Sequence, residues 1–395
     1  ALPGASVRVQ DNQLDVNGPG IACATGGTWI EGNKLAAGRQ GEREPSGAGI
    51  TLAPGLDPNG LDQAQVLGNQ ISGFEGAAIA VLAPAAELIV KLNIARDCGL
   101  GIVMGEEARS DTVSIENNHL RDLRGEPDGN GIVAGIAVLR TGTATIASNT
   151  VRRLAFEAAR SPLIAGVLTI ATQRARVSGN EIAEIAPMAE FAGLGAGIMV
   201  RAPCQRAEVQ HNQVVRDGGT AAEGAQSPWV AAMVEDQLIA AGTAGNNASL
   251  VSRTGSVTSV RIEERHTLVL AGSRAFIVAA ELDTDVTGAL VARGTSASLL
   301  GNHFRSLGRV SAVVVLAGGD TMFSDNHCEY RGGRAAVSIN SPTVIVNANR
   351  VKCDEQAITI VGAKSAAVLG NITTHGIALN GAPLPEEWRK FNLNG

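Results

Sequence analysis

The chain has 395 residues, of which 45% are hydrophobic but only 3% aromatic, and it contains 48 glycines and one tyrosine. A formal net charge of -6 and so few aromatic side chains exclude the basic, base-stacking surface of a nucleic-acid-binding protein. No apolar run reaches the roughly 18 residues of a membrane span, so we expect none.

A short phrase, apolar-x-x-Asn-x-apolar, recurs in both halves of the chain at irregular steps. Such a period is typical of a solenoid, in which each repeat is buried only by its neighbours. The phrase is missing between Asn212 and Asn302. Ten copies, and two looser ones at Asn93 and Asn371, are centred on Asn12, Asn33, Asn69, Asn93, Asn118, Asn149, Asn180, Asn212, Asn302, Asn326, Asn349 and Asn371.

A second apolar run lies midway in many repeats, and these runs are short and rich in β-branched residues, which predicts strands. Examples are residues 101–104, 135–138, 197–200, 312–315, 336–339 and 357–360. The pattern resembles the right-handed parallel β-helix superfamily, to which pectate lyases, pectin-modifying enzymes and phage tailspikes belong. We therefore expect an all-β fold, a single right-handed parallel β-helix of about 12 to 15 coils with an asparagine ladder.

The asparagine phrase has a structural explanation in such a coil. Asparagine tolerates the left-handed conformation of a tight bend, so we expect each one to occupy a corner between two strands. Neighbouring coils would place the side-chain amides about 4.8 Å apart, where they can bond along the stack. Flanking apolar residues such as Val177, Ile182 and Ile185 are predicted to point inward.

The domain prediction is a β-helix over residues 1–378 and a tail over 379–395 that leaves the repeat as a cap, with Trp388 and Phe391 over the open end. Irregular coils, or an inserted small β unit, are expected at about 218–297. Strand-like runs at 256–264, 267–272 and 275–280 predict about three coils there. Trp229 follows a proline in this segment, where it would bind a sugar or a partner, or pack under its own loop. Because the first repeat lies so near Ala1, we expect a protein partner at the N-terminal end.

Charged residues follow the ladder asparagines at fixed offsets and predict a stripe on consecutive coils. Such a stripe would bind a charged polysaccharide, or supply an acid and a base for glycosidic cleavage. The alternative is a solvated face of opposite charges, worth under about 1 kcal/mol per pair. Three residues after a ladder asparagine lie Arg96, Arg121 and Arg152. Four residues after one lie Asp97, Asp122, Arg153, Glu184 and Arg216.

Histidines and cysteines give weaker signals. His303 and His327 are expected to stack on adjacent coils, but no third ligand is fixed by spacing, so no metal site is predicted. The five cysteines, an odd number without C-x-x-C spacing, are interpreted mainly as small core residues, which favours a reducing compartment.

The resemblance carries two functional expectations. Pectate-lyase-like enzymes hold calcium with clustered aspartates beside a catalytic arginine, and Asp97, Asp122 and Arg153 imitate that cluster only in part. The tail residues "NGAPLPEEW" are similar to the closing segment of bacterial β-helix proteins associated with phage-tail-like injection systems.

The main hypothesis is therefore a non-catalytic structural or recognition module of a larger phage-tail-like or cell-surface assembly that binds glycan and needs no cofactor. Its setting would be a cytoplasmic assembly or an extracellular particle. The alternative is a polysaccharide lyase or glycoside hydrolase, acting in a groove on the coil face with Asp97, Asp122, Arg153 and Glu184. That alternative implies calcium for a lyase and the homotrimeric state of tailspikes.

Overall fold

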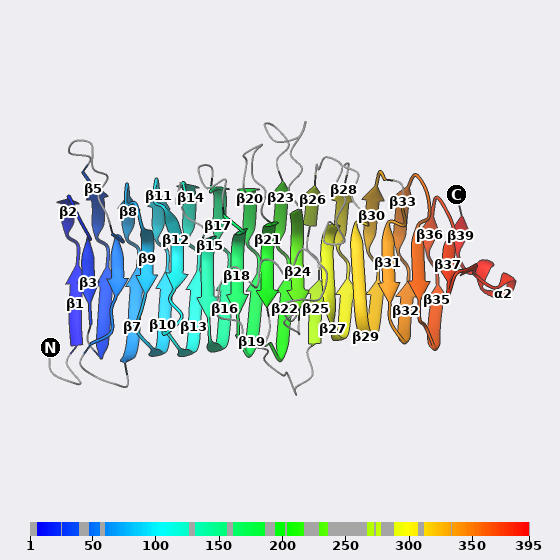
Figure 1. Ribbon diagram of the computed structural model, residues 1–395, viewed down its shortest axis with the longest axis horizontal. Coiled ribbons are helices and arrows are strands. Elements are labelled where there is room, and N and C mark those ends of the chain that lie inside the picture. Colours follow the sequence, from blue (N-terminus) through cyan, green and yellow to red (C-terminus); the bar gives the residue numbers. More distant parts are fainter. Residues whose placement is uncertain are drawn as a thin grey trace. The chain divides into compact units, whose positions relative to one another are not determined.

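The protein is represented by a computed structural model that divides into two compact units, Ala1–Pro187 and Met188–Gly395. Each unit is built almost wholly from parallel strands (Figure 1). The structure describes residues 6–24, 26–38, 47–55, 60–125, 131–155, 161–185, 194–201, 204–216, 229–235, 267–271, 274–277, 288–306, 312–332 and 334–394.

The strands of the first unit form three parallel stacks. The first stack contains β1 (Ser6–Gln10), β4 (Gly27–Glu31), β7 (Leu61–Leu67), β10 (Ala85–Lys91), β13 (Ser110–Glu116), β16 (Thr141–Ala147) and β19 (Arg174–Ser178). The second contains β2 (Gln13–Val16), β5 (Lys34–Ala37), β8 (Gln70–Ser72), β11 (Ile94–Arg96), β14 (His119–Leu123), β17 (Thr150–Leu154) and β20 (Glu181–Ile185). The third contains β3 (Ile21–Cys23), β6 (Ile50–Leu52), β9 (Ala77–Val81), β12 (Leu100–Met104), β15 (Ile132–Leu139) and β18 (Leu163–Ile170).

The second unit repeats this arrangement, except that two long strands, β27 (Gly288–Leu300) and β29 (Val314–Ser324), each pair in two stacks. One stack joins them to β22 (Arg206–Gln210), β25 (Thr267–Ala271), β32 (Thr343–Asn347) and β35 (Ser365–Leu369). Another joins them to β21 (Leu194–Arg201), β24 (Trp229–Glu235), β31 (Val337–Asn340), β34 (Ile358–Val361), β37 (Ile377–Leu379) and the antiparallel β38 (Ala382–Pro383). The remaining stack contains β23 (Gln213–Arg216), β26 (Arg274–Ile277), β28 (His303–Ser306), β30 (His327–Tyr330), β33 (Arg350–Cys353), β36 (Ile372–Thr373) and β39 (Leu393–Asn394).

Within each unit the chain visits the three stacks in turn and returns one strand further along, which is the path of a parallel β-helix. The predicted fold class is therefore confirmed, including the midway strands. Parallel pairing in register stacks like residues on like residues, and inward positions form aliphatic columns. One such column, with every member 0% exposed, is Ile30, Val66, Val90, Ile115, Ile146 and Val177. Burying each of these side chains contributes about 1.5 to 3 kcal/mol.

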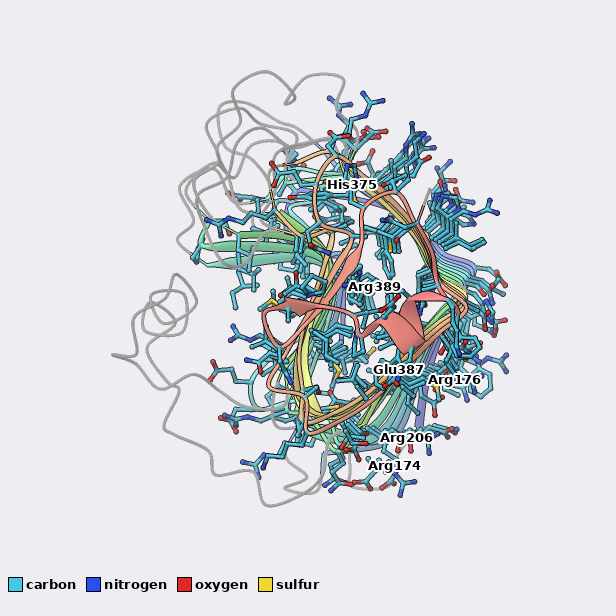
Figure 2. The ribbon with its side chains drawn as sticks, turned by 90° about the vertical axis from the view of Figure 1, so that its right-hand side faces the viewer. Arg174, Arg176, Arg206, His375, Glu387 and Arg389 are labelled. Atoms are coloured by element: carbon cyan, nitrogen blue, oxygen red, sulfur yellow. The ribbon has the colours of Figure 1, made fainter. Side chains whose placement is uncertain are left out.

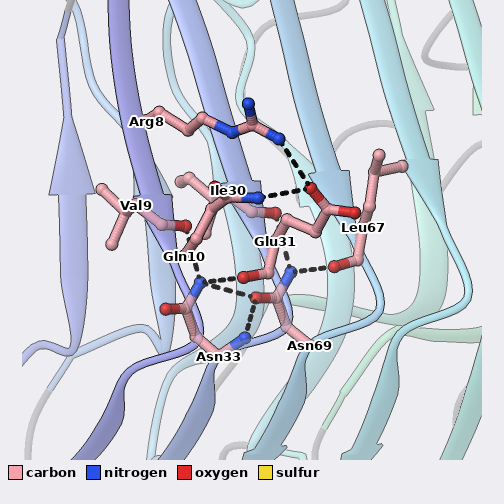
Figure 3. Close-up of polar contacts among 8 residues, drawn as sticks. All are labelled: Arg8, Val9, Gln10, Ile30, Glu31, Asn33, Leu67 and Asn69. Carbon is pink, nitrogen blue, oxygen red and sulfur yellow. Dashed lines mark hydrogen bonds and ion pairs between the residues drawn. The ribbon is translucent and has the colours of Figure 1, made fainter.

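The asparagine ladder is present in both units. Asn33 shows the pattern in Figure 3: its Nδ2 donates to the Val9 and Glu31 carbonyls and to Asn69 Oδ1, and its backbone N–H donates to the same Oδ1 at 2.9 Å. Equivalent bonds link the ladder of the first unit through Asn180 and join Asn302, Asn326, Asn349 and Asn371 in the second. Each amide thus serves its own corner and both neighbouring coils.

The left-handed corner residue is the one before the asparagine, so the predicted position was wrong by one residue. Leu92 (φ 61°) precedes Asn93 and Ala348 (φ 54°) precedes Asn349, whereas no ladder asparagine has a positive φ. The bend needs one left-handed residue, and placing it earlier leaves the asparagine side chain pointing inward to bond. Other positive-φ residues at this position are Asp11, Gly32, Gly68, Asn117, Ser148, Gly179, His211, Gly301, Asp325 and Gly370.

The C-terminal residues do not leave the repeat altogether, which corrects a second expectation. Strand β39 pairs with β36, and Asn371 Nδ2 donates to Asn392 Oδ1 at 2.8 Å. The ladder then closes on the short helix α2 (Glu386–Arg389), because Asn392 donates through Nδ2 to the Trp388 carbonyl and through its N–H to the Arg389 carbonyl. Figure 2 shows Arg389 on α2 at this end. Phe391 is 54% exposed, and Leu384, not the predicted aromatic pair, is the buried tail residue.

In the segment predicted to be irregular, the described residues form strands that keep the register. Strands β24, β25 and β26 make one coil between the coils of Asn212 and Asn302. The run predicted at 256–264 lies outside the described residues. The choice between further coils and an inserted β unit therefore stays a prediction.

Candidate functional site

The predicted charged stripe lies in the second stack of the first unit. Arg96 pairs in register with Arg121, and Arg121 with Arg152, so the three arginines occupy equivalent positions on β11, β14 and β17. Neighbouring strands are about 4.8 Å apart. The arginines therefore form a column with a strand-spaced repeat, and we call these three residues the arginine column.

The residues four positions after each ladder asparagine lie beside the arginine column, because the backbone there is left-handed. Asp97 (φ 53°), Asp122 (φ 54°), Arg153 (φ 56°) and Glu184 (φ 56°) all share this conformation. A left-handed residue interrupts the alternation of a strand, so two consecutive side chains face outward between buried neighbours. On β14 the outward pair is Arg121 and Asp122, which accounts for a stripe two residues wide.

Ion pairs connect the stripe from coil to coil. Arg153 Nη1 lies 3.1 Å from Asp122 Oδ1, and Arg152 Nη2 lies 3.4 Å from Glu184 Oε1. Arg121 Nε is 4.0 Å from Asp122 Oδ2. The arginine side chains of these pairs are more than half exposed, so each pair is a solvated contact of modest energy.

An additional arginine, which the sequence analysis did not select, lies beneath the stripe. Arg124 is 8% exposed and donates from Nη2 to the carbonyl of Asp97 at 3.2 Å and to that of Phe74 at 3.3 Å. It thereby fixes the left-handed corner that presents Asp97. In the sequence Arg124 is only a charged residue that directly follows the apolar Leu123, and this does not distinguish a buried arginine from a solvated one.

The remaining candidate residues are placed unevenly. His303 and His327 are in register, with ring centroids 4.8 Å apart, as expected from the repeat. Beside them Arg305 Nε and Glu329 Oε2 form an ion pair at 2.9 Å. The backbone of Trp229 belongs to β24, but its side chain and that of Arg216 lie outside the described residues.

Two kinds of chemistry are relevant to the described part of the chain: metal binding and reaction of a cysteine thiol. That part contains no group of three or more His, Cys, Asp or Glu side chains arranged to hold a metal ion. All five cysteines are buried thiols that form no disulfide, as predicted for most of them. Burial raises the pKa of the Cys98 thiol to about 11 and also raises the pKa of Cys328, which disfavours the reactive thiolate.

The fold and the stripe define the chain as a parallel β-helix repeat protein with a charged column on one stack. No protein-family model matches the chain, and neither a curated protein nor a solved structure is significantly similar to it. No helix among the described residues is long and apolar enough to cross a membrane.

Proposed function

We propose that this chain is a non-catalytic recognition module that binds an acidic polysaccharide along the arginine column. The observation that carries the proposal is the strict register of Arg96, Arg121 and Arg152 on neighbouring strands. A linear polymer repeats its carboxylates or sulfates along its length, and a strand-spaced column of guanidinium groups repeats in the same way. Planar guanidinium groups suit such anions because they donate two parallel hydrogen bonds to them.

The carboxylates of the stripe favour binding over catalysis. Asp122 and Glu184 each lie against an arginine, and their side chains are about 30% exposed. Glycosidic cleavage needs two carboxyl groups that flank the scissile bond. Here each of the two carboxylates instead forms an ion pair with an arginine of the stripe.

The setting of the module is also part of the proposal. Membership in the pectate-lyase-like superfamily is supported by three strands per coil and the asparagine ladder. A larger phage-tail-like or cell-surface assembly rests on the sequence resemblance alone. The enzyme alternative rests on the contact between Asp122 and Arg153, which places a carboxylate beside a guanidinium group.

The test is binding of the purified chain to immobilised polygalacturonate, alginate, hyaluronan and heparin, with dextran and xylan as neutral polymers. We expect an acidic polymer to bind, with an affinity that falls as salt rises. The triple variant R96Q/R121Q/R152Q should bind that polymer at least about tenfold more weakly. A matched control, R109Q/R140Q/R174Q, removes the same charge from exposed positions near the starts of β13, β16 and β19 and should bind as the parent does. Arg174 points outward in Figure 2.

Two outcomes would contradict the proposal. Equal losses in the triple variant and its control would show that net charge, not the column, determines binding. Shortened polymer chains or unsaturated products, measured with calcium and with chelator, would establish the enzyme alternative. Asp97, Asp122, Arg153 and Glu184 would then be the residues to replace.

A further inference from the structure

The first stack of the first unit presents an exposed tryptophan on its outward face. Trp29 lies in the middle of β4, between the inward residues Thr28 and Ile30, and is 36% exposed. Indole is the largest apolar side chain, so exposing it on a flat strand forgoes the burial that it would gain in the core. Because the sequence has only three tryptophans, such a position calls for an explanation.

The neighbours of Trp29 on this face are polar. Arg8 of β1 and Gln65 of β7 flank it in register, and Glu31 follows two residues along β4. On the other side comes Gly27, which adds no side chain to this face. The ring edge toward Gly27 therefore has no covering side chain from its own strand.

Contacts within the group hold the ring and the carboxylate in place. The guanidinium of Arg8 lies over the indole, 5.3 Å from the ring centroid, and donates to Glu31 Oε2 at 3.4 Å. Gln10 Nε2 donates to the same oxygen at 2.8 Å, as Figure 3 shows. Both donors thus converge on Oε2, which orients the Glu31 side chain.

Hydrogen-bonding capacity remains beside the ring. Among the residues that the structure describes, none bonds to Glu31 Oε1 or to the side-chain amide of Gln65. An oriented carboxylate oxygen accepts from hydroxyl groups, and an amide both donates and accepts. An aromatic face with such groups at its rim matches a sugar ring, which has C–H bonds on its face and hydroxyls around its edge.

A protein partner fits this surface less well. The core of a protein interface excludes water, and charged groups buried there must be paired. Here arginine, glutamate and glutamine surround a single aromatic ring. A sugar keeps these groups hydrogen-bonded while it covers the indole, so the polar surroundings favour it.

We propose that Trp29, together with Glu31 and Gln65, forms a binding subsite for a neutral pyranose. The indole stacks on the C–H face of the sugar, Glu31 Oε1 accepts from one hydroxyl, and the Gln65 amide bonds another. Arg8 fixes the ring and the carboxylate. The subsite lies on a different stack from the arginine column and does not depend on it.

The test follows the Trp29 indole N–H by NMR, assigned with Trp29→Phe, during titration with hexasaccharides of β1,4-glucose, α1,4-glucose, β1,4-xylose and β1,4-mannose. We expect at least one to shift the signal. Trp29→Ala should weaken that binding at least about tenfold and Glu31→Gln about threefold or more, whereas Trp29→Phe should retain part of it. Because these positions are exposed or part-exposed, circular dichroism should report an unchanged fold.

The outcomes separate this proposal from that of the arginine column. The variant R96Q/R121Q/R152Q should bind the hexasaccharide as the parent does, and Trp29→Ala should still bind the acidic polymer. If none of the four hexasaccharides moves the indole signal, the subsite is refuted. Parent-like hexasaccharide binding by folded Trp29→Ala would refute it equally.

Discussion

Asn118 offers the sharpest test of the ladder, because its side chain is 0% exposed and bonds in both directions along the stack. Its Oδ1 accepts from the N–H and Nδ2 of Asn93, both at 3.0 Å. Its Nδ2 donates to the Val90 carbonyl at 2.9 Å, to the Glu116 carbonyl and to Asn149 Oδ1. Replacement of Asn118 by alanine removes all these hydrogen bonds at once.

The cost of Asn118→Ala follows from the groups left without partners. The buried N–H of Asn93 loses its acceptor, at about 1 to 3 kcal/mol. The Nδ2 of Asn93 keeps the Val66 and Lys91 carbonyls, so it adds little. Two main-chain carbonyls lose a donor, each worth about 1 kcal/mol. We therefore expect the free energy of unfolding to fall by about 3 to 5 kcal/mol.

Two comparisons make this expectation refutable in denaturant unfolding experiments. Asn12→Ala removes the exposed end of the same ladder and should cost less than about 1 kcal/mol. Asn118→Asp keeps the volume of the side chain and leaves no cavity, but it places a carboxylate oxygen against the Val90 carbonyl. This variant should therefore lower the free energy of unfolding at neutral pH. Hydrogen exchange at the Asn93 amide should accelerate in Asn118→Ala. Equal costs at Asn118 and Asn12 would refute the structural role of the stacked amides.

Two further predictions concern the corner and the strand surface. Gly68→Ala should cost about 1 kcal/mol of unfolding free energy, because Gly68 has a left-handed φ of 62° although a Cβ there would meet nothing within 4 Å. The control is Gly131→Ala, where a Cβ also meets nothing within 4 Å but φ is not left-handed, and this variant should cost nothing measurable. Ser114 and then Lys91 lower the pKa of Glu116, so this carboxylate stabilises the fold above its ordinary pKa of about 4.3, and that contribution disappears as pH falls through the lowered value. In Ser114→Ala, NMR titration should show the Glu116 pKa moving upward; an unchanged value would refute this cause.

The fold was predictable from the sequence because one spacing carries both the ladder and the core. Around Asn180, for example, the apolar residues three positions before and two positions after the asparagine face inward, and Val177 and Ile182 are both 0% exposed. The register of the arginine column followed from counting onward from each asparagine. Counting works because the coils that carry these arginines make the same corner, whatever the length of the loops elsewhere.

Other features lay beyond such counting. The left-handed residue adjoins the asparagine, and both positions accept residues that tolerate a bend, so the sequence did not distinguish them. Asn392 escaped notice because Arg389 stands where the phrase needs an apolar residue, since α2 replaces the usual strand there. Trp29 carried a usable signal: alternation with the inward Ile30 places it outward.

The same physics explains how a repeat of such irregular length can present a regular surface. The asparagines preceding the arginine column are separated by 25 and 31 residues, yet Arg96, Arg121 and Arg152 stay in register. A slip of one residue would turn the buried Leu120 outward and orphan a ladder amide, so the extra residues are accommodated between strands and not within them. Loop length can therefore vary without moving the outward columns. A ligand bound by these columns would depend on the corner geometry and much less on the loops, so the variants at Asn118 and in the arginine column probe linked properties.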